Sequence, residues 1–177
     1  KYLDGIRRVV ETCQKHHVRV VICSGAITNE VPDKSESGFF QNMCDEGLEL
    51  ARSLGAQTID LLRPMREVQR RVIAFNEKTK DEKGRVTLHL ADGVHLSDLG
   101  HLAMGWAMLK GLHAPADVSE AVIDATESKS LSVSGCKVSD IRVSDHGVTF
   151  TRLDSGLPVN RGTFSVFDYR FIPVPED

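Results

Sequence analysis

The chain has 177 residues, which is the length of about one domain, and its 22 Lys and Arg against 25 Asp and Glu give a formal net charge of −3. This slightly acidic balance argues against a nucleic-acid-binding protein, and it gives no polybasic reason for binding a membrane surface. With 41% apolar and 27% charged residues, the composition is that of a globular domain and excludes the disordered class.

The first half of the chain alternates helical and strand-like patterns. Apolar residues at helical spacing predict a helix over residues 2–13, and the β-branched run Val18–Cys23 predicts a strand buried on both faces. A polar loop follows through Glu36. A second apolar helix face then runs from Phe40 to Leu54, where Gly55 is placed to cap the helix.

The same alternation continues to about residue 113. Residues 57–60 form a short strand candidate, and Pro64 suits the first turn of a third helix with Arg66, Arg70 and Arg71 on its solvent face. Residues 86–90 could be another strand, and Ser97 is a plausible N-cap for a fourth helix that carries Leu99, Leu102, Ala103, Trp106 and Leu109. Helices that alternate with short apolar strands indicate an α/β layered fold.

The pattern changes after Pro115. From about Ala121 the sequence becomes rich in Ser, Val and Gly, with turn signals at 134–135 and 145–147, which predicts a small β meander. A proline-bearing tail follows, whose aromatic residues are Phe164, Phe167, Tyr169 and Phe171. We therefore expect two parts, 1–114 and a β-rich extension 115–177 that packs on the first part through these aromatic residues.

The segment Leu90-Ala91-Asp92-Gly93-Val94-His95-Leu96-Ser97 carries the strongest chemical signal. Serine hydrolases need a neutral imidazole that takes the proton of the nucleophile, and a carboxylate that fixes the tautomer of this imidazole. A tight turn between Asp92 and His95 can bring the carboxylate onto Nδ1, and Gly93 accepts the backbone angles that such a turn needs.

In its full context this segment closely resembles the last block of the SGNH, or GDSL-like, hydrolases and esterases. The resemblance covers residues 1–113 and implies a flavodoxin-like three-layer fold, with Asp92 as the orienting acid and His95 as the general base. The Gly-Asp-Ser nucleophile motif of the family and the Gly and Asn donors of its oxyanion hole do not occur in this sequence. The chain therefore resembles the C-terminal part of such an enzyme, and we expect an N-terminal segment of the same protein to supply these groups.

Two other sources of chemistry stay open. Ser24 follows an apolar strand and could act as the nucleophile, although it lacks the Gly-x-Ser-x-Gly context, and it more simply lets the chain leave the strand. His89, Asp92, His95 and His101 could in principle bind a metal ion. A degenerate, non-catalytic hydrolase domain that acts as a binding module is a further alternative.

The resemblance implies ester hydrolysis through an acyl-enzyme, with no metal or organic cofactor. The sequence has no long apolar run that would suggest a lipid-binding lid, so we expect short-chain or carbohydrate esters as substrates. We expect neither a nucleic acid nor a membrane as partner. The sequence does not indicate a cellular location.

Overall fold

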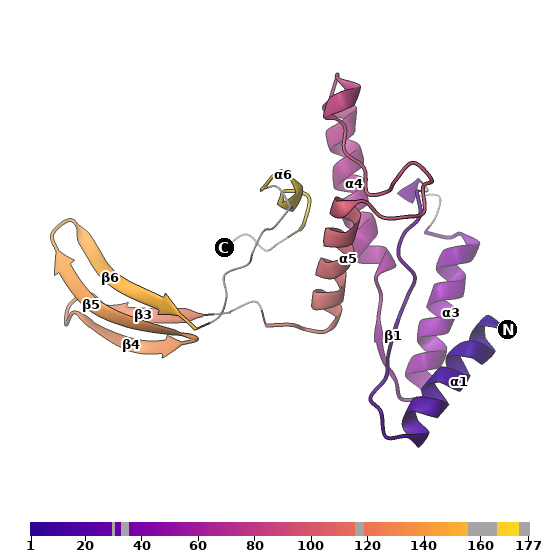
Figure 1. Ribbon diagram of the computed structural model, residues 1–177, viewed down its shortest axis with the longest axis horizontal. Helices are drawn as coiled ribbons and strands as arrows, with labels where there is room; N and C mark the ends of the chain where they lie inside the picture. Colours follow the sequence, from indigo (N-terminus) through magenta and orange to yellow (C-terminus); the bar gives the residue numbers. More distant parts are fainter. Residues whose placement is uncertain (30, 33–35, 116–118, 156–165, 174–177) are drawn as a thin grey trace. The chain divides into compact units, whose positions relative to one another are not determined.

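The computed structural model describes residues 1–29, 31–32, 36–115, 119–155 and 166–173. It divides into two compact units, one formed by Lys1–Ala114 together with Thr163–Asp177 and the other by Pro115–Gly162 (Figure 1). The fold is mixed α/β with short sheets, of which one is parallel and two are antiparallel. None of the helices in the described ranges has the length and apolar content needed to cross a bilayer.

All of the helices that the structure describes lie in the first unit. The elements of the main stretch of this unit, in chain order, are α1 (Tyr2–Lys15), β1 (Val21–Cys23), α3 (Phe39–Ser53), β2 (Gln57–Ile59), α4 (Leu62–Lys78), the 3₁₀ turn η1 (Glu82–Gly84) and α5 (Asp98–Gly111). After the second unit, the short helix α6 (Val166–Tyr169) returns to the first unit.

The strands β1 and β2 form a parallel pair in which Ile22 lies opposite Thr58. Alternate side chains of β1 face different groups of helices, as expected for a strand covered on both faces. Ile22 packs with apolar residues of α1 and α3, whereas Val21 packs against the larger core that α4 and α5 form. The pair is therefore flanked by helices on both faces, while a larger flavodoxin-like sheet stays a prediction.

Three expectations about single segments were wrong. Residues 86–90 form no strand, because their only β-type pairing is one isolated bridge between His89 and Leu96. Cys23, expected to be buried, is exposed at the end of β1. Arg66, expected on the solvent face of α4, is completely buried, whereas Arg70 and Arg71 of the same helix are exposed and pair with glutamates.

The end of the chain contributes to the core of the first unit. Phe171 and Ile172 are buried in the same apolar cluster as residues of α4 and α5. The ring of Phe171 meets the ring of Phe75 edge-on, with centroids 5.5 Å apart. The predicted tail residues Phe164 and Phe167 lie outside the side chains that the structure describes.

The second unit consists of two successive hairpins. They pair β3 (Glu120–Asp124) with β4 (Lys129–Ser134) and β5 (Cys136–Ser144) with β6 (Gly147–Asp154). The turn signal at 145–147 connects two paired strands, whereas Gly135 separates the two sheets instead of closing one meander. None of the described residues of this unit is buried. Its packing against the first unit stays a prediction.

Candidate active site

The predicted Asp-His loop connects residue 88 to the start of α5 and is closed by main-chain hydrogen bonds. The N–H of Leu90 donates to the carbonyl of His95 at 2.8 Å, and the N–H of Ser97 donates to the carbonyl of Leu88 at 2.9 Å. The bridge between His89 and Leu96 lies between these two bonds. Residues 91–94 are therefore the tip of a narrow loop with a fixed base.

The tip of the loop is a turn around Gly93, whose φ of +70° lies in the left-handed region that glycine adopts without steric cost. The N–H of Gly93 donates to the carbonyl of Leu90 at 3.0 Å. Oδ1 of Asp92 accepts the main-chain N–H groups of Val94 and His95, both at 2.9 Å. The carboxylate thus organises the turn that presents His95.

The side chains of Asp92 and His95 form the predicted pair. Nδ1 of His95 lies 2.6 Å from Oδ2 of Asp92. Because the carboxylate only accepts, Nδ1 carries the hydrogen, and in the neutral ring Nε2 presents its lone pair. The His95 side chain is 76% exposed, and Nε2 has no hydrogen-bonding partner among the described residues. The imidazole is therefore oriented for proton transfer at Nε2.

Hydrogen bonds also set the charge state of the carboxyl group. The main-chain N–H of Val94 and then the imidazole of His95 lower the pKa of Asp92 from 3.8 to about 2. Asp92 is consequently ionised over the whole neutral and mildly acidic range. A permanent negative charge next to Nδ1 stabilises the imidazolium that forms when Nε2 takes a proton.

The segment that follows β1 makes two hydrogen bonds with this loop. The N–H of Asn29 donates to the carbonyl of Gly93 at 2.9 Å. Nε2 of His89, whose side chain is buried, lies 3.0 Å from the carbonyl oxygen of Ile27. The position of the Asp92–His95 pair therefore depends on contacts with a segment that lies more than 60 residues earlier in the sequence.

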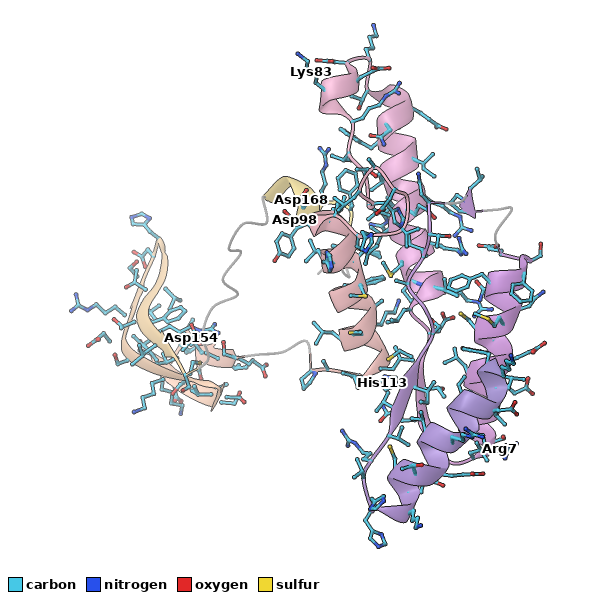
Figure 2. The ribbon with its side chains drawn as sticks, turned by 45° about the vertical axis from the view of Figure 1, so that its right-hand side comes forward. Arg7, Lys83, Asp98, His113, Asp154 and Asp168 are labelled. Atoms are coloured by element: carbon cyan, nitrogen blue, oxygen red, sulfur yellow. The ribbon has the colours of Figure 1, made fainter. Side chains whose placement is uncertain are left out.

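Ser97 connects the other side of the loop to α5. Its hydroxyl accepts the N–H of Gly100 at 3.2 Å, as predicted for an N-cap, and donates to the carbonyl of Thr87 at 2.6 Å. A Cβ on Gly100 would lie 2.1 Å from the carbonyl oxygen of Leu88, so the helix approaches the loop as closely as only glycine allows. Figure 2 shows Asp98 at the start of this helix.

A small pocket of about 180 Å³ lies between α4 and the segment that leads into the Asp-His loop. The pocket adjoins the Asp92–His95 turn, because one of its lining residues, Asn29, is hydrogen-bonded to Gly93. Its lining residues are Asn29, Val31, Gln69, Val72, Ile73, Asn76, Val86, Thr87, Leu88 and His89.

The other candidates from the sequence have structural roles. The Ser24 hydroxyl is buried and accepts hydrogen bonds from the N–H groups of Leu61 at 2.8 Å and Leu62 at 3.3 Å. It therefore provides an acceptor for main-chain N–H groups at the start of α4, which have no partner within the helix. His101 contacts the carbonyl of Ser97 through Nδ1 at 2.9 Å. Within the described ranges, His, Cys, Asp and Glu form no group of three or more that could hold a metal ion.

Sequence reasoning did not single out Asn29 or Ile27, and it considered His89 only as a metal ligand. Asn29 and Ile27 act through main-chain atoms, whose partners are set by how the loops pack rather than by the side chains. The only available signal was a histidine within an apolar segment next to the Asp-His loop.

The chain resembles one solved structure of known activity, described as BT4096, a gut microbial diltiazem-metabolizing enzyme. The two structures align with a TM-score of 0.57 and 22% sequence identity over 89% of this chain, so the likeness shows a shared fold. The chain spans 37% of the length of that enzyme. No protein-family profile matches the chain, and none of the curated proteins does.

Proposed function

We propose that the chain supplies the acid–base pair of a serine esterase of the SGNH type. The observation that carries this proposal is the 2.6 Å contact between His95 Nδ1 and Asp92 Oδ2 in a loop that leaves Nε2 exposed. Imidazoles that act as general bases toward a serine hydroxyl are oriented in this way. The shared fold with an enzyme of drug metabolism is compatible with the proposal at the level of a hydrolase-like fold.

The reaction has two steps, and the nucleophile comes from a segment outside this sequence. In the first step, the serine hydroxyl attacks the acyl carbon of the ester while His95 Nε2 accepts its proton. His95 then gives this proton to the departing alcohol, which leaves an acyl-serine. In the second step, water attacks the acyl group with His95 again as base, and the released serine regains its proton.

Asp92 acts through His95 during both steps. It holds the hydrogen on Nδ1, so that Nε2 is the nitrogen that accepts the proton, and its charge stabilises the imidazolium. No metal or organic cofactor is required by this mechanism. The proposed substrates are esters of short acyl chains or of carbohydrates.

The proposal is tested by producing residues 1–177 both alone and joined to the protein sequence that precedes them in the gene, and by assaying p-nitrophenyl acetate hydrolysis. We expect turnover only for the longer protein. In that protein, His95→Ala should lower kcat/KM by about 10²- to 10⁴-fold, the usual contribution of a general base. Asp92→Asn should also lower kcat/KM, because it removes the charge and permits the wrong imidazole tautomer.

His101→Ala is the matched control, because it removes an exposed histidine of the same region that lies outside the Asp92–His95 pair. This variant should retain its activity. Full activity in His95→Ala would disprove the role of the pair. Turnover by residues 1–177 alone that a serine-directed phosphonate blocks would place the nucleophile within this sequence and contradict the proposed division.

A further inference from the structure

The pocket beside the Asp-His loop contains an imidazole that the proposed reaction does not use. His89 is only 2% exposed, and it lines this pocket between α4 and residues 86–89. Because Nε2 of His89 faces the carbonyl oxygen of Ile27 at 3.0 Å, this nitrogen must carry a hydrogen. In the neutral ring, Nδ1 is then a hydrogen-bond acceptor.

The acceptor Nδ1 of His89 has no hydrogen-bonding partner among the described residues. This nitrogen is not among the fully enclosed side-chain atoms that lack a partner, so it is open to solvent and to a molecule in the pocket. A polar atom that is open in this way is satisfied by water or by a bound molecule. Two other polar residues of the pocket already have hydrogen-bond partners in the protein. The carboxamide of Asn76 makes two hydrogen bonds with the main chain of Val86, and the hydroxyl of Thr87 contacts the main chain of His89.

The residues that line the pocket indicate which kind of ligand it can bind. None of the described residues that line the pocket carries a carboxylate, an ammonium or a guanidinium group, so a charged ligand would be desolvated without a counterion. Val72, Ile73 and Val86 provide apolar walls next to the polar edge. The volume of about 180 Å³ corresponds to roughly six water molecules, which suits one small ring.

We propose that this pocket, called here the His89 pocket, binds the hydroxyl-bearing alcohol part of the ester, with one ligand hydroxyl donating to Nδ1 of His89. The assignment rests on the proposed esterase function. The contact between Asn29 and Gly93 places the wall of the pocket next to the turn that carries Asp92 and His95. A cyclic polyol held in the His89 pocket would therefore lie next to the Asp-His loop.

The test uses residues 1–177 labelled with ¹⁵N and needs no catalytic turnover. Methyl β-xylopyranoside is titrated into the protein while the imidazole nitrogen resonances are recorded. We expect a saturable shift of the Nδ1 resonance of His89. 2-Methoxytetrahydropyran has the same ring and methoxy group but no hydroxyl, so it should bind about tenfold more weakly, the loss expected for one hydrogen bond.

Two variants make the test independent of His89 itself. Ile73 lines the pocket and is 38% exposed on α4, so Ile73→Trp should fill the pocket without disturbing the core and remove the response. Leu109→Trp adds the same ring at an exposed position of α5 outside the pocket lining, and it should leave the response unchanged.

The proposal is overturned if the xyloside causes no saturable shift at His89, if the hydroxyl-free compound binds equally well, or if Ile73→Trp binds normally. Failure of the esterase assay is a separate result. Esterase activity without xyloside binding would remove only the pocket assignment. Binding of the xyloside without esterase activity in the longer protein would leave a polyol site but overturn its link to an ester substrate.

Discussion

Asp92 combines two roles in one carboxylate, since Oδ1 holds the turn and Oδ2 orients His95. At the scale of single residues, such a pair is recognisable in the sequence because its members are only three positions apart. The geometry follows from local chemistry: an Asp side chain that accepts main-chain N–H groups two and three residues later is a common turn element, and the following glycine accepts a positive φ.

The titration of Asp92 provides the first prediction at this scale. The pKa of about 2 in the folded protein lies below its ordinary value of 3.8, so ionisation of Asp92 favours folding above pH 3.8. This contribution is lost as the pH falls through about 2. The carboxyl ¹³C resonance of Asp92 in a pH titration should show this midpoint, and a midpoint near 3.8 would mean that the turn hydrogen bonds are absent in solution.

Replacing Gly93 should disturb the pair without touching either side chain. In Gly93→Ala, the φ of +70° is unfavourable, and the new Cβ would lie 3.2 Å from Cβ of Asn29. We expect the free energy of unfolding to fall by about 1 kcal/mol or more, and the downfield Nδ1 proton resonance of His95 to shift or broaden. Chemical denaturation and one-dimensional proton NMR measure the two effects.

Gly93→Asn is the comparison variant, because Asn tolerates positive φ better than Ala does. It should lose less stability than Gly93→Ala if the backbone conformation dominates. If both variants lose the same free energy of unfolding, the loss comes from the contact of the new Cβ with Asn29 and not from the backbone conformation.

At the scale of elements, most of the fully buried positions of α5 are small residues, and the large apolar residues Leu102 and Trp106 are only partly buried. The buried positions of this helix are Leu99, Gly100, Ala103 and Ala107, whereas Leu109 is exposed. Gly111 comes so close to Ile59 of β2 that a Cβ would lie 2.4 Å from the Ile59 side chain. Close approach of the helix to β2 and to the loop thus determines which face is buried.

Two glycines of α5 therefore form a matched pair for mutagenesis. In Gly100→Ala, the Cβ would collide with the Leu88 carbonyl, so we expect a loss of about 1–3 kcal/mol from the free energy of unfolding. In Gly105→Ala, the Cβ meets no atom within 4 Å, so the better helix propensity of alanine should stabilise the protein by roughly 0.5–1 kcal/mol. Denaturant melts of both variants measure these changes, and the same sign in both would contradict the packing argument.

At the scale of the whole molecule, the chain passes through the second unit and then returns to complete the core of the first. Phe171 is buried against Phe75, and the guanidinium of Arg170 lies 4.0 Å from the centre of the Phe75 ring. The last part of the chain is consequently a structural component of the unit that contains the Asp-His loop.

This arrangement predicts a large effect for Phe171→Ala. Loss of a buried phenylalanine should reduce the free energy of unfolding by about 3–5 kcal/mol, and truncation after Ala114 should be at least as harmful because it removes the same contact. Phe150→Ala provides the control, because this side chain is 43% exposed in β6 and should cost about 1 kcal/mol or less. A truncated protein as heat-stable as the parent would contradict the prediction.

The sequence by itself determined the features whose causes lie within a few residues. The helices around Ile6 and Val68, the cap at Ser97 and the pairing of Asp92 with His95 all depend on local periodicity, side-chain capping or a short turn. These interactions involve neighbours in the chain, so residue types and spacing are sufficient to predict them.

Only the tertiary structure decided which local patterns were overridden. It buried Arg66 on a helix that reads as amphipathic, it left residues 86–90 without a strand partner, and it engaged the Ser24 hydroxyl at the start of α4. It also fastened Asn29 and His89 to segments distant in sequence. These outcomes depend on which segments of the chain contact one another in the folded protein. The periodicity of apolar residues indicates which face of a helix or strand is buried, but it does not indicate which other segment covers that face.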